Sequence, residues 1–315
     1  MSPKLEKYLP LSVDEVLPYL ACPQCHTPFY LGDLSGNETS RAPKSLPCKS
    51  CGKTYPFTDG VPDFRPPELA ALAPTDLHSS LKACLQQRRG LFRTIQIVNR
   101  ILFPVVNLAS KKNLRELGST CQRNFPNLPI LNLGSGAGTG RGIAYLPRRI
   151  DLDAVIMPGV TVLADARSLP FADGTVAAVV TQGVLEHLPD PWAVAREAMR
   201  VLAPGGHIYA EVPLVEGYHA DPDDYWRFTR SGLRVLFAGM EPYREGATSG
   251  PASAAGLFLR EFIGSFSTNR WIHAFLKYFV GSILAIPLRP FDYWLGRKKN
   301  AHVLAASLHF WGIKK

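Results

Sequence analysis

The sequence predicts an α/β fold with a mostly parallel sheet and helices on both faces, preceded by a small cysteine-based module. Between residues 128 and 248, short apolar runs alternate with turns and helical segments, which is the order that builds a parallel sheet. Four cysteines in two CxxC pairs lie within the first 66 residues, and the Pro-rich stretch VPDFRPPEL closes that part. With 315 residues, 46% of them hydrophobic, the chain can form one large domain and a small one.

Composition divides the chain into four zones. Residues 1–66 hold the cysteine pairs, and residues 67–127 form a linker followed by a basic amphipathic helical segment. Residues 128–248 form the α/β core, and residues 249–315 are helical, apolar and basic before a strand-like end, HVLAASLHFWGI. The first twenty residues contain no uninterrupted apolar run before a small-residue cleavage site, so we expect no secretory signal and a cytoplasmic protein.

The formal net charge of +9 is unevenly distributed. Residues 78–113 carry seven Lys or Arg and no acid, and residues 268–315 carry eight Lys or Arg against one acid. The remainder of the chain is therefore mildly acidic, at −5. A mildly acidic core disfavours a nucleic-acid groove running through the active site.

The cysteine pairs have the spacing of a metal site. Cys22 and Cys25 form one CxxC turn, Cys48 and Cys51 form the other, and 22 residues separate the two turns. Two such turns complete a tetrahedral four-sulfur zinc site without an open coordination position, so the zinc is expected to be structural. A module this small buries little apolar area, so metal binding should supply much of its folding energy.

The text around these cysteines, LACPQCHTPF and LPCKSCGKTYPFTDGVPDF, resembles a known family. It is similar to the small zinc-ribbon family that activates RNA and protein methyltransferases, most specifically in YPFTDGVPDF. The resemblance implies that residues 1–66 fold as a zinc ribbon.

A second constellation begins at PILNLGSGAG, residues 129–138. An apolar strand here runs into a Gly-rich turn, where the backbone can approach a ligand closely. The segments RRID, TVLADARSLPF and TVAAVVTQGVLEHLPDP follow, then a helix from about Pro191 to Leu202, the turn APGG and the strand HIYAEVPL. This series resembles the class I methyltransferases that use S-adenosylmethionine (SAM), and the resemblance covers residues 128–248. A NAD-binding Rossmann domain is the competing interpretation, and DARSLPF and LEHLPDP fit it less well.

The resemblance implies a Rossmann-like, seven-stranded methyltransferase sheet. HVLAASLHFWGI would be its antiparallel last strand, paired beside a sixth strand near PYREGATS. Asp151 would hold the ribose hydroxyls, Asp165 would accept from the adenine amino group, and the amide of Ala166 would donate to the ring. The other cofactor-binding residues implied are those of the turn against methionine and ribose and those bordering the methionine end: Gly134, Ser135, Gly136, Gly138, Gln182 and Gly183.

Two departures from the family pattern affect the expected fold. Asn132 replaces the usual acid of the first strand, which weakens the expected grip on the ammonium end of SAM. Only about a dozen residues separate Gly138 from Asp151, and a crossover with its helix normally needs at least ~10–12 residues. We therefore expect truncated helices after the first and second strands.

The chemistry is expected in the segment YHADPDDYWRFT, which follows the fifth strand and should face the acceptor. We predict that His219 is the general base, oriented by Asp221 or Asp223, with Trp226 as a wall. The alternative is that this segment caps the next helix and packs Trp226 in the core. His187 is a second catalytic candidate, with a role in lining the methionine pocket or in simple loop structure.

The acceptor class rests on a further resemblance. YHADPDDYWRFTRSG is similar to a bacterial group of methyltransferases associated with saccharide or envelope biosynthesis. It favours O-methylation of a saccharide, glycolipid or related small acceptor. Methylation of RNA or protein, and a SAM-binding scaffold without turnover, are the alternatives.

The basic apolar flanks have two interpretations. Residues 90–112 and 271–299 combine apolar and aromatic runs with Lys and Arg, as do helices that lie in a membrane interface. Peripheral contact with the inner face of the membrane is one prediction. The other is that both segments are lids over the active site.

Overall fold

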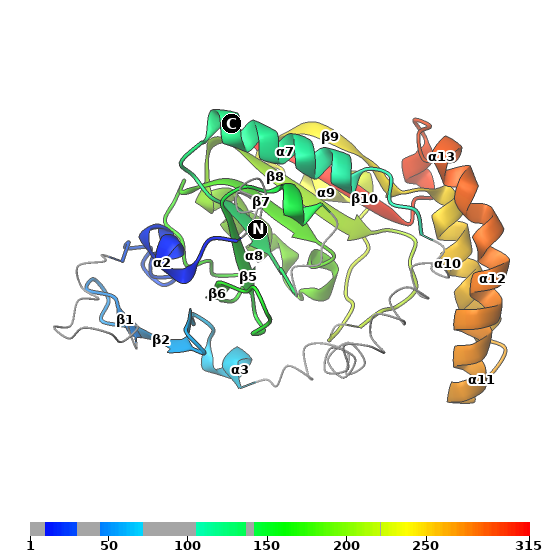
Figure 1. Cartoon of the computed structure of the whole chain (residues 1–315), viewed down its shortest axis with the longest axis horizontal. Helices are drawn as coiled ribbons and strands as arrows, with labels where there is room; N and C mark the ends of the chain where they lie inside the picture. The colour runs from blue at the N-terminus through cyan, green and yellow to red at the C-terminus, as the bar shows by residue number, and fades with distance from the viewer. Residues whose placement is uncertain (1–9, 30–44, 72–104, 137–141, 221) are drawn as a thin grey trace, which may run out of the picture.

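The computed structural model describes residues 10–29, 45–71, 105–136, 142–220 and 222–315. Its centre is a seven-stranded sheet in the order β6-β5-β4-β7-β8-β10-β9 (Figure 1). The predicted α/β fold with seven strands is thereby confirmed. The strands are β4 (Ile130–Leu133), β5 (Arg149–Asp153), β6 (Val162–Leu163), β7 (Val176–Gln182), β8 (Leu202–Pro213), β9 (Met240–Ser249) and β10 (Ser307–Lys314).

The sheet is parallel except at one edge. β6, β5, β4, β7 and β8 pair in parallel, and β10 lies antiparallel between β8 and β9. The predicted last strand is therefore in place, although it begins at Ser307, after the short helical turn η7 (Ala301–Val303). Every residue of β4 and β5 is buried, as expected for strands covered on both faces.

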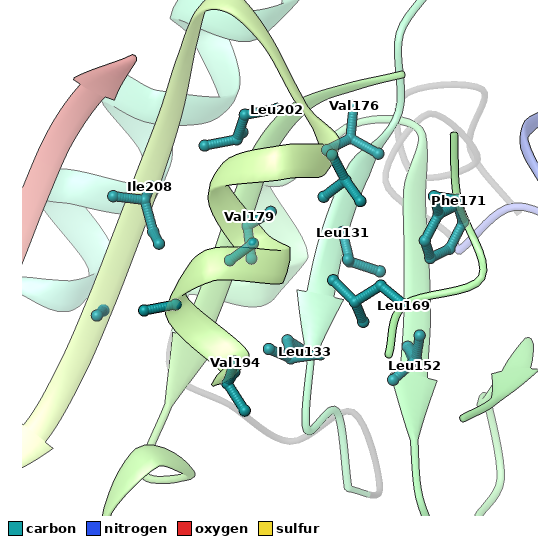
Figure 2. Packing of buried hydrophobic residues seen from close by; sticks show 14 of the residues in the cluster. Leu131, Leu133, Leu152, Leu169, Phe171, Val176, Val179, Val194, Leu202 and Ile208 are labelled. Atoms are coloured by element: carbon teal, nitrogen blue, oxygen red, sulfur yellow. The ribbon is translucent and has the colours of Figure 1, made fainter. Parts of the chain in front are cut away.

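Helices cover the two faces of the sheet. α7 (Ser110–Asn124) packs Leu114, Leu117 and Cys121 against one face. α8 (Pro191–Val201) and α9 (Arg230–Leu236) lie on the other, where side chains such as Val194 join those of the strands (Figure 2). α8 matches the predicted helix and begins where the Asp190 carboxylate accepts the Ala193 amide, 3.0 Å away.

The connections after β4 and β5 are short, as expected. Among the described residues, only the turn η3 (Ile143–Tyr145) lies between β4 and β5, and residues 154–161 between β5 and β6 contain no helix. The basic segment predicted at 90–112 lies outside the described residues up to 104. Residues 110–112 of that segment form the start of α7. The sequence did not indicate that this helix packs on the sheet.

The cysteine-containing region packs directly onto the sheet. It comprises α2 (Val13–Val16), η1 (Leu17–Tyr19), a three-stranded antiparallel sheet and α3 (Pro67–Ala70). The Phe64 amide donates to the Leu163 carbonyl at 2.8 Å, and the Ala21 amide to Pro170 at 2.9 Å. Phe64 also belongs to the same buried cluster as the sheet residues. The small sheet consists of β1 (Ser45–Pro47), β2 (Thr54–Thr58) and β3 (Val61–Pro62).

A helical hairpin stands at the opposite end of the molecule, beside the β9 edge (Figure 1). Its first arm is α10 (Pro251–Gly264), and its second is the continuous helical rod Arg270–Leu295. The rod comprises α11 (Arg270–Phe275), the π-helical segment η5 (Leu276–Gly281), α12 (Ser282–Ala285), the 3₁₀ segment η6 (Ile286–Phe291) and α13 (Asp292–Leu295).

Candidate functional site

A cavity of about 290 Å³ opens at the carboxyl ends of β4, β5, β6 and β7. This edge is where ligands bind in open parallel α/β sheets. Leu69, from α3 of the cysteine-containing region, completes one wall, so that region contributes to the site. The other lining residues are Gly134, Gly136, Leu152, Asp153, Ala154, Val155, Ala164, Asp165, Ala166, Arg167, Gly183, Val184, His187, Leu188, Pro189, Pro222, Asp223 and Tyr225.

Two glycines shape the turn after β4. Gly134 has φ +69°, and a Cβ there would lie 2.4 Å from Cγ2 of Val184. Gly136 has φ +52° and nothing within 4 Å of a would-be Cβ, so its backbone faces open space in the cavity. The backbone can therefore approach a ligand closely here, as the sequence predicted.

Asp151, predicted to hold the ribose, does not line the cavity. Its carboxylate is buried in mid-strand, where it accepts from Arg149 Nε at 2.7 Å and from Asn132 Nδ2 at 2.7 Å. The strand continues two residues further, and Asp153 reaches the cavity instead. The Asp153 carboxylate accepts the Gly136 amide at 2.7 Å, which places it beside the Gly-rich turn. Asp153 rather than Asp151 is thus the acid of this strand that lines the cavity, because the strand ends two residues later than the sequence indicated.

Asp165 and Ala166 line the cavity, as predicted. The Asp165 carboxylate accepts from the Arg167 backbone amide at 2.8 Å and from Arg167 Nη2 at 2.7 Å. Its side chain is 13% exposed and that of Arg167 is 47% exposed, so the arginine covers the acid at the cavity rim.

The remaining predicted cofactor residues divide into two groups. Gly183 lines the cavity together with Gly134 and Gly136. Gln182 instead donates from Nε2 to Glu211 at 2.9 Å, and Ser135 is buried outside the lining, so neither side chain reaches the cavity. Gly138 lies outside the described residues.

His187 lines the cavity, and His219, which is not among the lining residues, lies next to it. His187 lies in the turn η4 (Leu185–His187) after β7, and His219 follows β8; their rings are 5.1 Å apart and perpendicular. His187 Nδ1 is 2.6 Å from the Asp223 carbonyl, and His219 Nδ1 is 3.1 Å from the Gly217 carbonyl. Because a carbonyl only accepts, the contact with the Asp223 carbonyl places the ring hydrogen of His187 on Nδ1. Nδ1 of His219 faces both the Gly217 carbonyl, which accepts, and Nη2 of Arg227 at 3.4 Å, which donates.

Glu186 lies between the two histidines. Its Oε1 is 3.9 Å from Nε2 of His187 and 3.9 Å from Nε2 of His219. Its Oε2 is buried and has no hydrogen-bond partner among the described residues. Burial raises the pKa of the Glu186 carboxyl to about 8. The sequence placed Glu186 beside His187, but its position between two imidazoles depends on the fold.

Asp224 is the acid that orients His219. Its Oδ2 accepts the His219 backbone amide at 2.9 Å and lies 3.4 Å from Nδ1 of the ring. Burial alone would raise the pKa of Asp224, but hydrogen bonds from Arg227 and from the His219 amide outweigh it and lower the pKa to about 2. Asp224 is therefore an anion, and it was absent from the predicted site.

The sequence predicted Asp221 or Asp223, not Asp224, as the acid that orients His219. The Asp223 carboxylate accepts from the hydroxyl of Tyr225 at 3.0 Å, and only its carbonyl meets a histidine, His187. The prediction of Asp223 was thus wrong, because its side chain turns to Tyr225. Asp221 lies outside the described residues.

Trp226 follows the packing alternative. Its Nε1 donates to the Leu188 carbonyl at 2.9 Å, and its ring packs against the core beside Trp192 and Phe228. The C-terminal segment that was expected as a possible lid does not cover the cavity, because no described residue from 249 to 315 lines it.

The four cysteines converge in the other candidate site. Cys22 Sγ lies 3.6 Å from Cys51 Sγ, Cys25 Sγ lies 3.5 Å from Cys48 Sγ, and all four sulfurs lie within 4.8 Å of one another. A regular tetrahedron with Zn–S bonds of about 2.3 Å has S–S distances of about 3.8 Å. The arrangement is compatible with a four-thiolate zinc site.

Comparison with known proteins agrees with this geometry. Residues 133–210 match a family model described as a methyltransferase domain. An uncharacterized methyltransferase of Mycobacterium sp. strain KMS is 39% identical over 89 residues, which are 24% of this chain and 35% of that protein. One from Mycobacterium tuberculosis strain H37Ra is 33% identical over 91 residues, 24% of this chain and 36% of that protein. The matched region thus spans about a third of these curated relatives.

The comparison with solved structures gives matches at low identity. The 1,6-didemethyltoxoflavin-N1-methyltransferase of Burkholderia thailandensis is 15% identical, with a TM-score of 0.41, over 85% of this chain and 98% of that one. The family model and the curated relatives agree with the prediction in that residues 133–210 are similar to a methyltransferase domain.

Two matched variants test whether Asp153, rather than Asp151, is the acid that binds the cofactor. We expect Asp153→Asn to weaken SAM binding about 10- to 100-fold, because a hydrogen bond to a charged group contributes ~1.5–3 kcal/mol. We expect Asp151→Asn to leave the affinity of the folded protein nearly unchanged and to lower its unfolding free energy by ~3–5 kcal/mol, because Arg149 loses its buried partner. Titration calorimetry and urea unfolding measure the two effects. The reverse pattern would restore Asp151 as the ligand.

The position of Glu186 predicts a pH dependence of stability. Between about pH 4.5 and pH 8 the folded state keeps a proton that the unfolded chain has lost, so the unfolding free energy should fall as pH rises through this range. The Glu186→Gln variant has no carboxyl to titrate, so its unfolding free energy should not fall in this way. Its unfolding free energy relative to that of the parent protein should therefore rise by a few kcal/mol from pH 5 to pH 8. Urea unfolding across this range measures it. The exposed Glu241→Gln is the control, and an equal change in both variants would contradict the assignment.

Proposed function

We propose that this protein is a SAM-dependent methyltransferase that methylates an oxygen of a saccharide, glycolipid or related small acceptor. The observation that carries the proposal is the pair His187 and His219: His187 lines the cavity, the His219 ring lies 5.1 Å from it, and two acids, Glu186 and Asp224, lie beside them. An oxygen acceptor must lose a proton when it is methylated, and this cluster can take that proton.

The residues around the cavity fit the cofactor. The Gly134–Gly136 turn offers open backbone, Asp153 offers a carboxylate beside it, and Asp165 with Ala166 lies on the side where adenine would be held. When bound, SAM supplies an activated methyl group on a sulfonium. The chain would hold the ribose hydroxyls with Asp153 and the adenine edge with Asp165 and the Ala166 amide.

His219 is the proposed base. Its Nε2 lone pair is available because Nδ1 is held by the Gly217 carbonyl and faces Asp224. When Nε2 takes the proton of the acceptor hydroxyl, the ring becomes a cation between the Asp224 carboxylate, 3.4 Å from Nδ1, and Glu186, 3.9 Å from Nε2. His187, on the cavity wall, would orient the acceptor.

The decisive experiment supplies methyl-labelled SAM to the full chain and fractionated host lysate. Label in the glycan or lipid fraction, lost in Asp153→Asn, is the expected result. Label in RNA or protein would instead support the alternative acceptors. Confirmed SAM binding without any labelled fraction would favour a scaffold and contradict the proposal.

The role of His219 is tested once an acceptor is found. We expect His219→Gln to lower kcat by ~10²–10⁴-fold while the SAM Kd stays within about threefold, because the variant loses the proton acceptor and keeps the cofactor contacts. His302→Gln, outside the cavity and the histidine pair, is the matched control. Full turnover in His219→Gln would eliminate it as the base.

We further propose that the four cysteines hold one structural zinc ion. The sulfur distances fit a tetrahedral site, and the two CxxC turns are built alike: the residue after each second cysteine, His26 or Gly52, has φ of 57° or 74°. The His26 amide bonds the Cys22 carbonyl at 2.8 Å, and the Gly52 amide bonds the Cys48 carbonyl at 2.9 Å. Such paired turns point the thiolates toward a common centre.

Zinc analysis of the purified chain tests this site. We expect one zinc per chain, lost in Cys48→Ala and kept in Cys121→Ala, because Cys121 belongs to α7 and its thiol is buried between that helix and the sheet. Because the region shares the main core and supplies Leu69 to the cavity, loss of zinc should also lower Tm and SAM affinity. A Cys48→Ala variant that retains zinc would contradict the assignment.

A further inference from the structure

The helical hairpin is a well-defined body whose two arms hold each other. The buried carboxylate of Asp292 accepts the amides of Ala252 and Ser253, both at 2.8 Å, and so caps the N-terminal end of α10 from the second arm. Closer to the turn that joins the arms, Lys277 Nζ lies 2.8 Å from Glu261 Oε1. The arms therefore keep a fixed mutual orientation, and each presents a fixed outer surface.

That outer surface is strongly apolar. The rod Arg270–Leu295 has a mean hydropathy of 1.5 over its most apolar window, yet only 17% of that window is buried. A core helix of the same composition would be mostly covered, and monomeric soluble proteins rarely expose a large contiguous apolar patch. The exposed large side chains of the hairpin are Phe258, Phe262, Phe266, Trp271, Ile272, Phe275, Tyr278, Phe279, Ile283, Leu284, Phe291, Tyr293 and Trp294.

Both ends of the rod combine an exposed tryptophan with a cation. The Arg270 guanidinium lies 4.8 Å from the ring centre of Trp271, and the Lys298 ammonium lies 3.8 Å from that of Trp294. Residues 265–300 contain six Lys or Arg and a single acid, Asp292, which is fully buried. Residues 265–300 thus expose apolar and cationic side chains without exposed acid, and Glu261 of α10, which is 40% exposed, is paired with Lys277. Such a surface complements an anionic lipid surface.

The dimensions favour a hairpin that lies in the interface over one that spans the bilayer. The rod has the length and composition to cross a membrane, but α10, with 14 residues, extends only about 21 Å against a hydrocarbon core of ~30 Å. Spanning would also place Lys277, Glu261 and the buried Arg260 in hydrocarbon, where charged groups are costly. Shallow insertion leaves these three charged side chains near the lipid headgroups.

We propose that the outer face of the α10–α13 hairpin docks the protein on an anionic lipid bilayer. The hairpin lies along the headgroup region, with its aromatic side chains in the acyl boundary and Arg270, Arg297, Lys298 and Lys299 on lipid phosphates. This surface is separate from the cavity, and docking does not depend on methyl transfer.

Flotation of the full chain with lipid vesicles tests the proposal. Vesicles of phosphatidylcholine with phosphatidylglycerol should bind the chain at least about tenfold more tightly than phosphatidylcholine alone, and added salt should weaken the binding. Trp271→Glu should lower binding about tenfold or more, because a charge replaces an interfacial aromatic. Val235→Glu is the matched control: Val235 is 67% exposed on α9, compared with 72% for Trp271, and the change in charge is the same.

A second pair of variants tests the charge separately. Lys298→Gln with Lys299→Gln should reduce the preference for phosphatidylglycerol, whereas Lys49→Gln with Lys53→Gln, at the opposite end of the molecule, should preserve it. Circular dichroism and SAM titration verify that each variant is folded. Failure of the parent chain to float, or equal losses in Trp271→Glu and Val235→Glu, overturns the proposal.

A second copy of the chain is the competing occupant of this surface. Analytical ultracentrifugation distinguishes the two. If Trp271→Glu converts a dimer into a monomer while vesicle binding stays unchanged, the hairpin joins two copies and the proposal is overturned. A parent chain that stays monomeric without lipid, and floats only with anionic vesicles, supports it.

Discussion

The parallel pairing of β5, β4, β7 and β8 is the constraint on which the rest of the structure depends. Parallel pairing makes all four strands end at one edge of the sheet. Its register aligns Leu133 with both Leu152 and Thr181, so Gly134 leaves the sheet at the level of Asp153. The cavity exists because these ends coincide.

The histidine pair depends on two loops that are bonded to each other. The carbonyl of Glu186, in η4, accepts the amide of Tyr225 at 2.7 Å, and the Asp223 carbonyl meets His187 in return. Arg227 binds Asp224 from the same segment, with Nη2 2.6 Å from Oδ2. The imidazoles thus come together through backbone contacts, and the buried carboxyl between them has a pKa suited to proton exchange near neutral pH.

The sequence predicted the sheet well because buried strands and Gly-rich turns are local patterns. It misplaced the ribose acid because RIDLD offers two acids and periodicity alone does not say where the strand ends. Nothing local in the sequence marks Asp224 as the acid that orients His219, because its ion pair with Arg227 forms only in the folded chain. Likewise, the docking of the cysteine-containing region and of α7 consists of tertiary contacts, and composition left the hairpin open between a lid and a membrane element.

Asn132 on β4 is part of a buried hydrogen-bond network with Arg149 and Asp151 on β5. Its amide donates to Asp151, which is also held by Arg149, so a buried carboxylate in the second strand is balanced by one cation and one neutral donor. An aspartate at 132 would set two carboxylates in contact and leave one cation to serve both. A single Asn132→Asp change would therefore disturb the buried contacts of Asp151, so the residue that fits at position 132 depends on those at 149 and 151.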